Sequence, residues 1–477
     1  MARTAAPTAP AGTIHRTIAL LHDALRALHA EMPLAEVERV AVMINEGMSA
    51  GARSFHTPEH VFDLVQAGRP RGTLAALFHD LVYYQVDQGF VPSVARVVEN
   101  GIEAKDGKLS LPAGAATDRT MALTMAVFGL QPGQVLPPFG GMNEFLSALV
   151  MNRTLAAVVK EEDLLRATAC IEATIPFRAP AADGTTPSQA LAARLSAAVK
   201  RLRLSLDAAA ITEAVQQAAT FANGDVANFA DREVTRFLDN TWKLLPETNP
   251  SLRFQGVYSV KSYRTALQKM EGFLRALDPG TIFARYEGVP SDKEYALKRR
   301  RAERNVITAR SYLGIKLLTA AILEALADIS GGDAPVSLFM GDIGATIRGS
   351  RLEDYLPAPP KAAGAVDMTL HDLLAYGRAS ASSFDLQNSP LSLFIYLHLG
   401  SDGFRDFLAS ARRMFDGTLS ARAFLDTLPG TLVAAVAEGC ARMALTRRPA
   451  LEAFVTAARS GGSANGITRG KSTRRRA

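Results

Sequence analysis

Three of the eight histidines in this 477-residue chain lie close together in the sequence, namely His56, His60 and His79. His79 is followed directly by Asp80, and an uncharged apolar run, Leu74–Phe78, precedes the pair. An imidazole and a carboxylate inside an apolar helix need a partner, because burying unpaired polar groups is costly. That partner is a metal ion, a salt bridge or a trapped water, and the additional histidines upstream favour the metal ion.

The elements that hold these residues are predicted to be helices. Thr57 is a suitable N-cap and Pro58 suits the first helical position, so a helix is expected to start there. His60 then lies in the first turn and His56 just before the cap. A second helix is expected over residues 72–86, with the His-Asp pair in its C-terminal half.

The rest of the chain is also predicted to be helical. Apolar residues recur with a period near 3.6 almost throughout, and strand patterns are scarce, which predicts an all-α fold. Two further helices are expected at about 188–205 and 208–230. The expected organisation is a disordered N-terminus at 1–12, a metal-binding helical domain at 13–240, a second helical region of unknown role at 241–458 and a basic disordered tail at 459–477.

Composition excludes several classes of protein. Hydrophobic residues make up 48% of the chain and charged residues 21%, as in ordinary globular proteins. We expect no membrane segment, because no uncharged apolar run approaches the length that spans a bilayer. The N-terminus lacks the apolar core of a secretory signal, and the two cysteines share no motif, so we expect a cytoplasmic protein.

The net charge of +6 is concentrated at the C-terminus. Residues 459–477 hold six arginines and lysines and no acidic residue, so the remainder of the chain is close to neutral. This distribution argues against a folded domain that binds nucleic acid. It leaves a weak contact with polyanions through the tail as the expected role of the charge.

Two segments resemble a known family. Arg53–His60, with the sequence RSFHTPEH, and Leu77–Tyr83, with the sequence LFHDLVY, resemble the HD superfamily of metal-dependent phosphohydrolases. In the small bacterial HD hydrolases the first of these motifs is R-x-Y-H-x-x-x-H and the second is F-H-D-x-V-Y. The two segments are also similar to motifs in the catalytic domain of cyclic-nucleotide phosphodiesterases. Phe55 replaces the usual tyrosine, and the acidic residue that follows the second motif in small hydrolases is displaced to Asp87.

The resemblance implies an all-helical HD bundle and assigns roles to residues. The metal ligands carried over are His60, His79 and Asp80, together with an aspartate from a later helix. Asp225 lies in the segment ANGDVAN, which resembles a phosphodiesterase motif, and is the expected fourth ligand, with Asp231 as the alternative. His56 matches the general acid of the phosphodiesterases.

The implied activity is hydrolysis of a small phosphorylated substrate, a phosphate mono- or diester, with nucleotides among the candidates. The expected cofactor is a divalent ion of Zn, Mn, Fe, Co or Mg. HD-type di-iron oxygenases need further histidines, and none occurs here between His79 and His371, which favours hydrolysis. The alternative is a non-enzymatic module that keeps the HD scaffold and binds a partner through residues 241–458.

Overall fold

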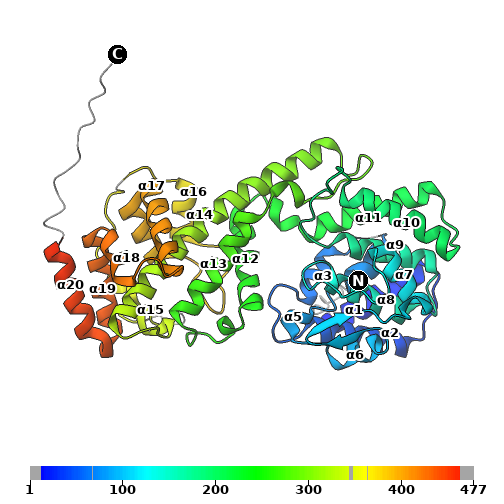
Figure 1. Cartoon of the computed structure of the whole chain (residues 1–477), viewed down its shortest axis with the longest axis horizontal. Helices are drawn as coiled ribbons and strands as arrows, with labels where there is room; N and C mark the ends of the chain where they lie inside the picture. Colours follow the sequence, from blue (N-terminus) through cyan, green and yellow to red (C-terminus); the bar gives the residue numbers. More distant parts are fainter. Residues whose placement is uncertain (1–11, 67, 343–346, 363, 462–477) are drawn as a thin grey trace, which may run out of the picture. The chain divides into compact units, whose positions relative to one another are not determined.

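The chain is all-α, as the sequence predicts (Figure 1). The computed structural model describes residues 12–66, 68–342, 347–362 and 364–461. Within these ranges the only β-structure in regular strands is one antiparallel hairpin, β1 (Glu103–Lys105) and β2 (Lys108–Ser110). Most of the N-terminal segment and of the basic tail that were expected to be disordered lie outside the described residues.

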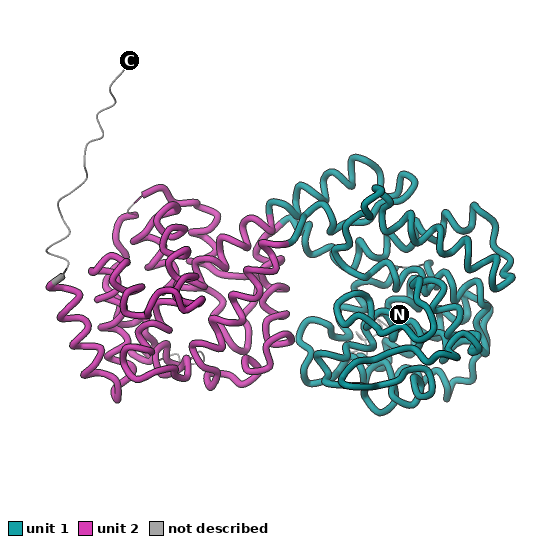
Figure 2. Tube along the Cα trace, in the orientation of Figure 1, with its two compact units in different colours: residues 1–232, 277–304 teal, residues 233–276, 305–477 magenta. Residues whose placement is uncertain are grey.

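Two compact units make up the chain (Figure 2). Unit 1 contains the residues up to Arg232 together with Leu277–Arg304, and unit 2 contains Glu233–Ala276 and the residues from Asn305 onward. The division expected at residue 240 lies inside helix α12 (Val234–Thr248), and residues 277–304 were expected in the second region. Contacts between non-adjacent segments place residues 277–304 in unit 1.

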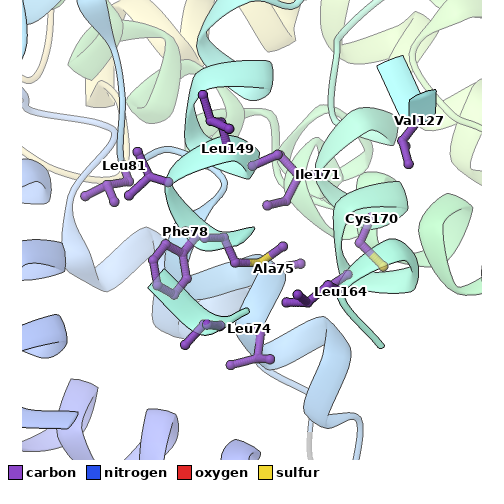
Figure 3. Close-up of a cluster of buried hydrophobic side chains, with 14 of the residues drawn as sticks. Leu74, Ala75, Phe78, Leu81, Val127, Leu149, Leu164, Cys170 and Ile171 are labelled. Carbon is purple, nitrogen blue, oxygen red and sulfur yellow. The ribbon is translucent and has the colours of Figure 1, made fainter. Parts of the chain in front are cut away.

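Unit 1 is built from short helices that surround a buried central helix, α4 (Pro70–Phe78). Leu74 and Phe78 of α4 are fully buried, and Figure 3 shows them in one cluster with Leu149 of α8 (Met142–Leu155) and with Leu164 and Ile171 of α9 (Glu161–Ala173). The α-helices that lie wholly within unit 1 are α1 (Thr13–Ala27), α2 (Leu34–Met48), α3 (Pro58–Leu64), α4 (Pro70–Phe78), α5 (Tyr84–Asp87), α6 (Pro92–Val98), α7 (Arg119–Phe128), α8 (Met142–Leu155), α9 (Glu161–Ala173), α10 (Pro187–Leu202) and α11 (Ala208–Asp225).

The helix expected over residues 72–86 is in fact two helices, α4 and α5. The backbone turns after Phe78 because side chains from elsewhere bind its polar groups. Arg53 donates hydrogen bonds to the carbonyl oxygens of Asp80 (2.6 Å) and Leu81 (3.2 Å), and the amide of Val82 donates to Ser147 Oγ at 3.0 Å. These contacts replace the bonds that a continuous helix would make. The expected helices at 188–205 and 208–230 correspond to α10 and α11.

Unit 2 is also helical and has its own core. Within it, the carboxylate of Asp385 accepts hydrogen bonds from Trp242 (2.8 Å), Tyr263 (3.0 Å) and Lys316 (2.9 Å). Helix α14 (Asp292–Ser330) begins in unit 1 and continues in unit 2. The other helices of unit 2 are α12, α13 (Val260–Ala276), α15 (Val336–Met340), α16 (Met368–Tyr376), α17 (Pro390–Phe415), α18 (Ala421–Thr427), α19 (Gly430–Met443) and α20 (Arg448–Gly461).

No helix among the described residues has both the length and the apolarity needed to cross a membrane.

Candidate metal centre

Three helix ends position four polar side chains of unit 1. His60 lies in the first turn of α3, which starts at Pro58 after the extended residue Thr57. His79 directly follows the last residue of α4 and is almost fully buried. Asp225 is the last residue of α11. Helix ends therefore bring together side chains that are far apart in the sequence.

His60, His79, Asp80 and Asp225 form one compact group. Each contributes one nitrogen or carboxylate oxygen, and these four atoms all lie within 4.8 Å of one another. His60 Nε2 is 2.9 Å from Asp225 Oδ1, and His79 Nε2 is 2.9 Å from Asp80 Oδ2. The cross distances are 3.8 Å between His60 and Asp80 and 3.5 Å between His79 and Asp225. Two imidazoles and two carboxylates at this spacing form a donor set typical of a divalent metal ion.

The tautomer of His79 suits a metal ligand. Its Nδ1 lies 2.9 Å from the carbonyl oxygen of Ala76, and because a carbonyl only accepts, Nδ1 must carry the hydrogen. In the neutral ring, Nε2 then has a free lone pair that faces the group. A backbone carbonyl that orients the second nitrogen of a histidine in this way is usual beside metal ligands.

Two atoms of the group are buried without a hydrogen bond. Among the described residues, neither His79 Nε2 nor Asp80 Oδ2 has a hydrogen-bond partner, although the two atoms are only 2.9 Å apart. The two atoms are close enough for a hydrogen bond, but the bond angles at the two atoms do not suit one. Buried polar atoms left in this state require an explanation, and a shared metal ion accounts for both.

The electrostatics of the group also favour a cation. Burial lowers the pKa of His79, but the carboxylates of Asp80 and Asp225 outweigh burial and hold that pKa well above its usual value. Burial raises the pKa of Asp80, and the neighbouring histidines, His79 first, bring it far below its usual value. The two carboxylates therefore stabilise positive charge at this point, and a proton on His79 competes with a metal ion for it.

His56 lies beside the group but is not one of its four members. The ring of His56 is 6.1 Å from that of His60 and meets the ring of Tyr83 edge-on at 4.8 Å. Asp231 is also outside the group: it follows a short 3-10 helix, η2 (Ala227–Ala230), and its backbone carbonyl accepts a hydrogen bond from Arg304 at 3.1 Å. The structure thus brings Asp225, rather than Asp231, to the histidines.

Glu144 is a neighbour of the group that the sequence analysis missed. It lies in the first turn of α8. Burial raises its pKa to about 7, with a further contribution from the carboxylates of Asp80 and Asp225. A signal was present in the sequence, because Glu144 is the one charged residue between Met142 and Asn152. A lone carboxyl in such an apolar run indicates a special environment.

Arg53 has a positioning role that the sequence analysis did not assign. Its side chain is fully buried and forms an ion pair with Asp87 at 2.6 Å, in addition to its bonds to the backbone after His79. Asp87 is the displaced acidic residue noted in the second motif. The Arg53–Asp87 pair therefore holds the segment that carries Asp80 against the segment that precedes His56.

No protein family model matches this chain, and no curated protein or solved structure matches it significantly. The functional assignment therefore depends on the chemistry of the four-residue group and its neighbours.

Proposed function

We propose that unit 1 is an HD-type metal-dependent phosphohydrolase that acts on a phosphate mono- or diester. One observation carries the proposal, which is the convergence of His60, His79, Asp80 and Asp225 within 4.8 Å. The resemblance of residues 53–60 and 77–83 to HD motifs supports the same assignment. The proposed partner is a small phosphorylated molecule, with nucleotides among the candidates.

The proposed cofactor is one divalent ion, held by His60, His79, Asp80 and Asp225. A divalent ion supplies Lewis acidity, which makes a water molecule nucleophilic near neutral pH and offsets the charge on phosphoryl oxygens. The mixed nitrogen and oxygen donors suit Zn, Mn, Fe, Co and Mg. Asp80 and Asp225 contribute the negative charge that would retain the ion. The hydrogen bond from His79 Nδ1 to the carbonyl oxygen of Ala76 keeps Nε2, the proposed metal ligand, directed at the group.

His56 is the proposed general acid. Its ring is half-buried and packs edge-on against Phe55 and Tyr83, with ring centroids 4.9 and 4.8 Å apart. These contacts hold the imidazole next to the group without making it a member. A histidine in this place can donate a proton to the oxygen of the leaving group as the ester bond breaks.

The two candidate aspartates provide a matched test. We expect Asp225→Asn to lose bound metal and the hydrolysis of bis-p-nitrophenyl phosphate together, because it removes one anionic donor. Asp231→Asn makes the same chemical change six residues further on and should keep both. Metal content is measured by mass spectrometry after desalting, and hydrolysis by the release of p-nitrophenolate.

Two results would contradict the proposal in different ways. Full metal content in Asp225→Asn would show that the group is not the metal site. Normal metal binding in the wild-type protein without hydrolysis of any phosphate ester would favour the alternative, a binding module built on the same scaffold.

We also propose a cytosolic location, which the two unpaired and buried cysteines, Cys170 and Cys440, support.

A further inference from the structure

Unit 1 contains a cavity of about 460 Å³ that the proposed chemistry does not use. Its walls are the end of α9 with the loop that follows, the start of α10, the last turns of α11 and the segment 280–288. A volume in the range of roughly 300–1,000 Å³ is usual for small-molecule sites. The cavity is therefore large enough for an organic ligand.

The cavity is next to the four-residue group. Ala222 and Val226 of its wall lie on either side of Asp225 in the sequence. None of the four residues of the group is itself in the wall, so the cavity and the group share the C-terminal end of α11.

The segment 280–288 closes one side of the cavity and is attached firmly. The buried amide of Asn223 donates to the carbonyl oxygen of Ala284 at 2.8 Å and accepts from its backbone amide at 2.7 Å. Gln216 donates to the carbonyl oxygen of Glu287 at 3.0 Å. Phe283 is almost fully buried and anchors the segment. Asn223 is two residues from Asp225, so the wall and the proposed ligand share one turn of α11.

The lining indicates the chemistry of the ligand. Aromatic rings of Phe177, Tyr286 and Tyr295 face the cavity together with aliphatic side chains such as Ala219. Both of its arginines have carboxylate partners: Arg178 binds Glu172 at 2.6 Å, a carboxylate that Arg194 also binds, and Arg285 binds Asp292 at 2.5 Å. An unpaired charge would be costly in such a site, whereas a flat ring gains both apolar burial and ring contacts.

We propose that this cavity binds an uncharged aromatic group and that the segment 280–288 determines which groups fit. That this group is the organic part of the hydrolysed ester rests on the proposed function. The binding of the aromatic group does not depend on a metal ion, so the two proposals can fail separately.

The first experiment measures the binding of 1-naphthol to the full-length protein by calorimetry. Ala219→Leu fills the cavity from α11, and we expect it to weaken binding by about tenfold or more. The matched control is Ala209→Leu on the exposed first turn of the same helix, which should bind as wild type does. Tyr286→Ala, on the segment 280–288, provides a second variant that removes a ring without filling the core, and it should also weaken binding.

The second experiment compares hydrolysis of 1-naphthyl phosphate and phenyl phosphate. We expect kcat/KM to be higher for the naphthyl ester in the wild type, and Ala219→Leu to reduce this preference. Unchanged naphthol binding in both Ala219→Leu and Tyr286→Ala would overturn the cavity proposal, whatever the hydrolysis. Naphthol binding that follows the cavity variants, without hydrolysis of these esters or of bis-p-nitrophenyl phosphate, would overturn the phosphohydrolase proposal and leave the aromatic site standing.

Discussion

At the scale of single residues, the two histidines of the first motif have different surroundings. His60 contacts Asp225 directly, whereas His56 packs against the rings of Phe55 and Tyr83. Replacing His60, which contacts a proposed ligand carboxylate, should therefore affect metal binding and activity differently from replacing His56, which lies beside the group.

We expect His56→Ala to keep its metal and its fold but to lose turnover by about 100- to 10,000-fold, the usual contribution of a general acid. The loss should be smaller for esters of p-nitrophenol, because that leaving group needs little protonation. His60→Ala should lose metal and activity together. Metal analysis and rates with good and poor leaving groups make the comparison. If His56→Ala is the variant that loses metal, the two roles are reversed.

Glu144 leads to a prediction about stability and pH. Burial raises its pKa from the ordinary 4.5 to about 7, so the folded protein holds this proton more tightly than the unfolded chain does. The stability gained from the neutral carboxyl is present below pH 4.5 and is lost as the pH rises through about 7. The loss amounts to no more than about 3 kcal/mol, from the free energy of one pKa unit.

Glu144→Gln removes this titration and should therefore raise the melting temperature of the metal-depleted protein more at pH 8 than at pH 4. Melting curves across this range, read by circular dichroism, measure the effect. The control is Glu31→Gln, which changes an exposed carboxyl. An equal shift at both pH values would show that Glu144 does not ionise as the structure indicates.

At the scale of elements, the turn between α4 and α5 depends on one buried ion pair. Arg53 binds two backbone carbonyls and Asp87, and its side chain has no exposed surface. The backbone conformation of the residues after His79 is thus set by a side chain from a different segment. The position of Asp80 within the group depends on this turn.

We expect Arg53→Ala to lower the free energy of unfolding by about 3–5 kcal/mol, because the buried carboxylate of Asp87 would lose its partner. It should also weaken metal binding. Arg39→Ala, which removes an arginine from an exposed pair with Glu36, should cost less than about 1 kcal/mol. Urea unfolding measures both. Similar costs for the two changes would mean that the buried pair does not stabilise the turn.

At the scale of the whole molecule, unit 1 is assembled from two separated stretches of sequence. Residues 277–304 follow two helices of unit 2 and then return to pack on α11. The four proposed metal ligands all come from the first stretch, whereas one wall of the cavity comes from the second.

A fragment that ends at residue 240 should therefore bind metal but melt at a lower temperature than a fragment that ends at residue 304. The shorter fragment lacks Ala284, the backbone partner of the buried Asn223, and it uncovers the apolar surface beneath Phe283. It should also lose affinity for 1-naphthol. Equal melting temperatures for the two fragments would show that residues 277–304 contribute nothing to the fold of unit 1.

The sequence by itself determined the all-α class and the local arrangement around the first three proposed ligands. Helical periodicity depends on neighbours three and four residues apart, and the start of α3 depends on Thr57 and Pro58, so both can be inferred without a fold. The expected helix over residues 72–86 was wrong in its middle, because Arg53 and Ser147 bind its backbone from distant segments.

Only the tertiary structure decided between Asp225 and Asp231 and revealed Glu144 and the returning segment 277–304. Two aspartates six residues apart are equivalent in a local pattern, and which one meets the histidines depends on where α11 ends relative to α3 and α4. The pKa of Glu144 depends on burial and on carboxylates from two other helix ends. Such contacts between segments far apart in the sequence arise from packing, which no local pattern specifies.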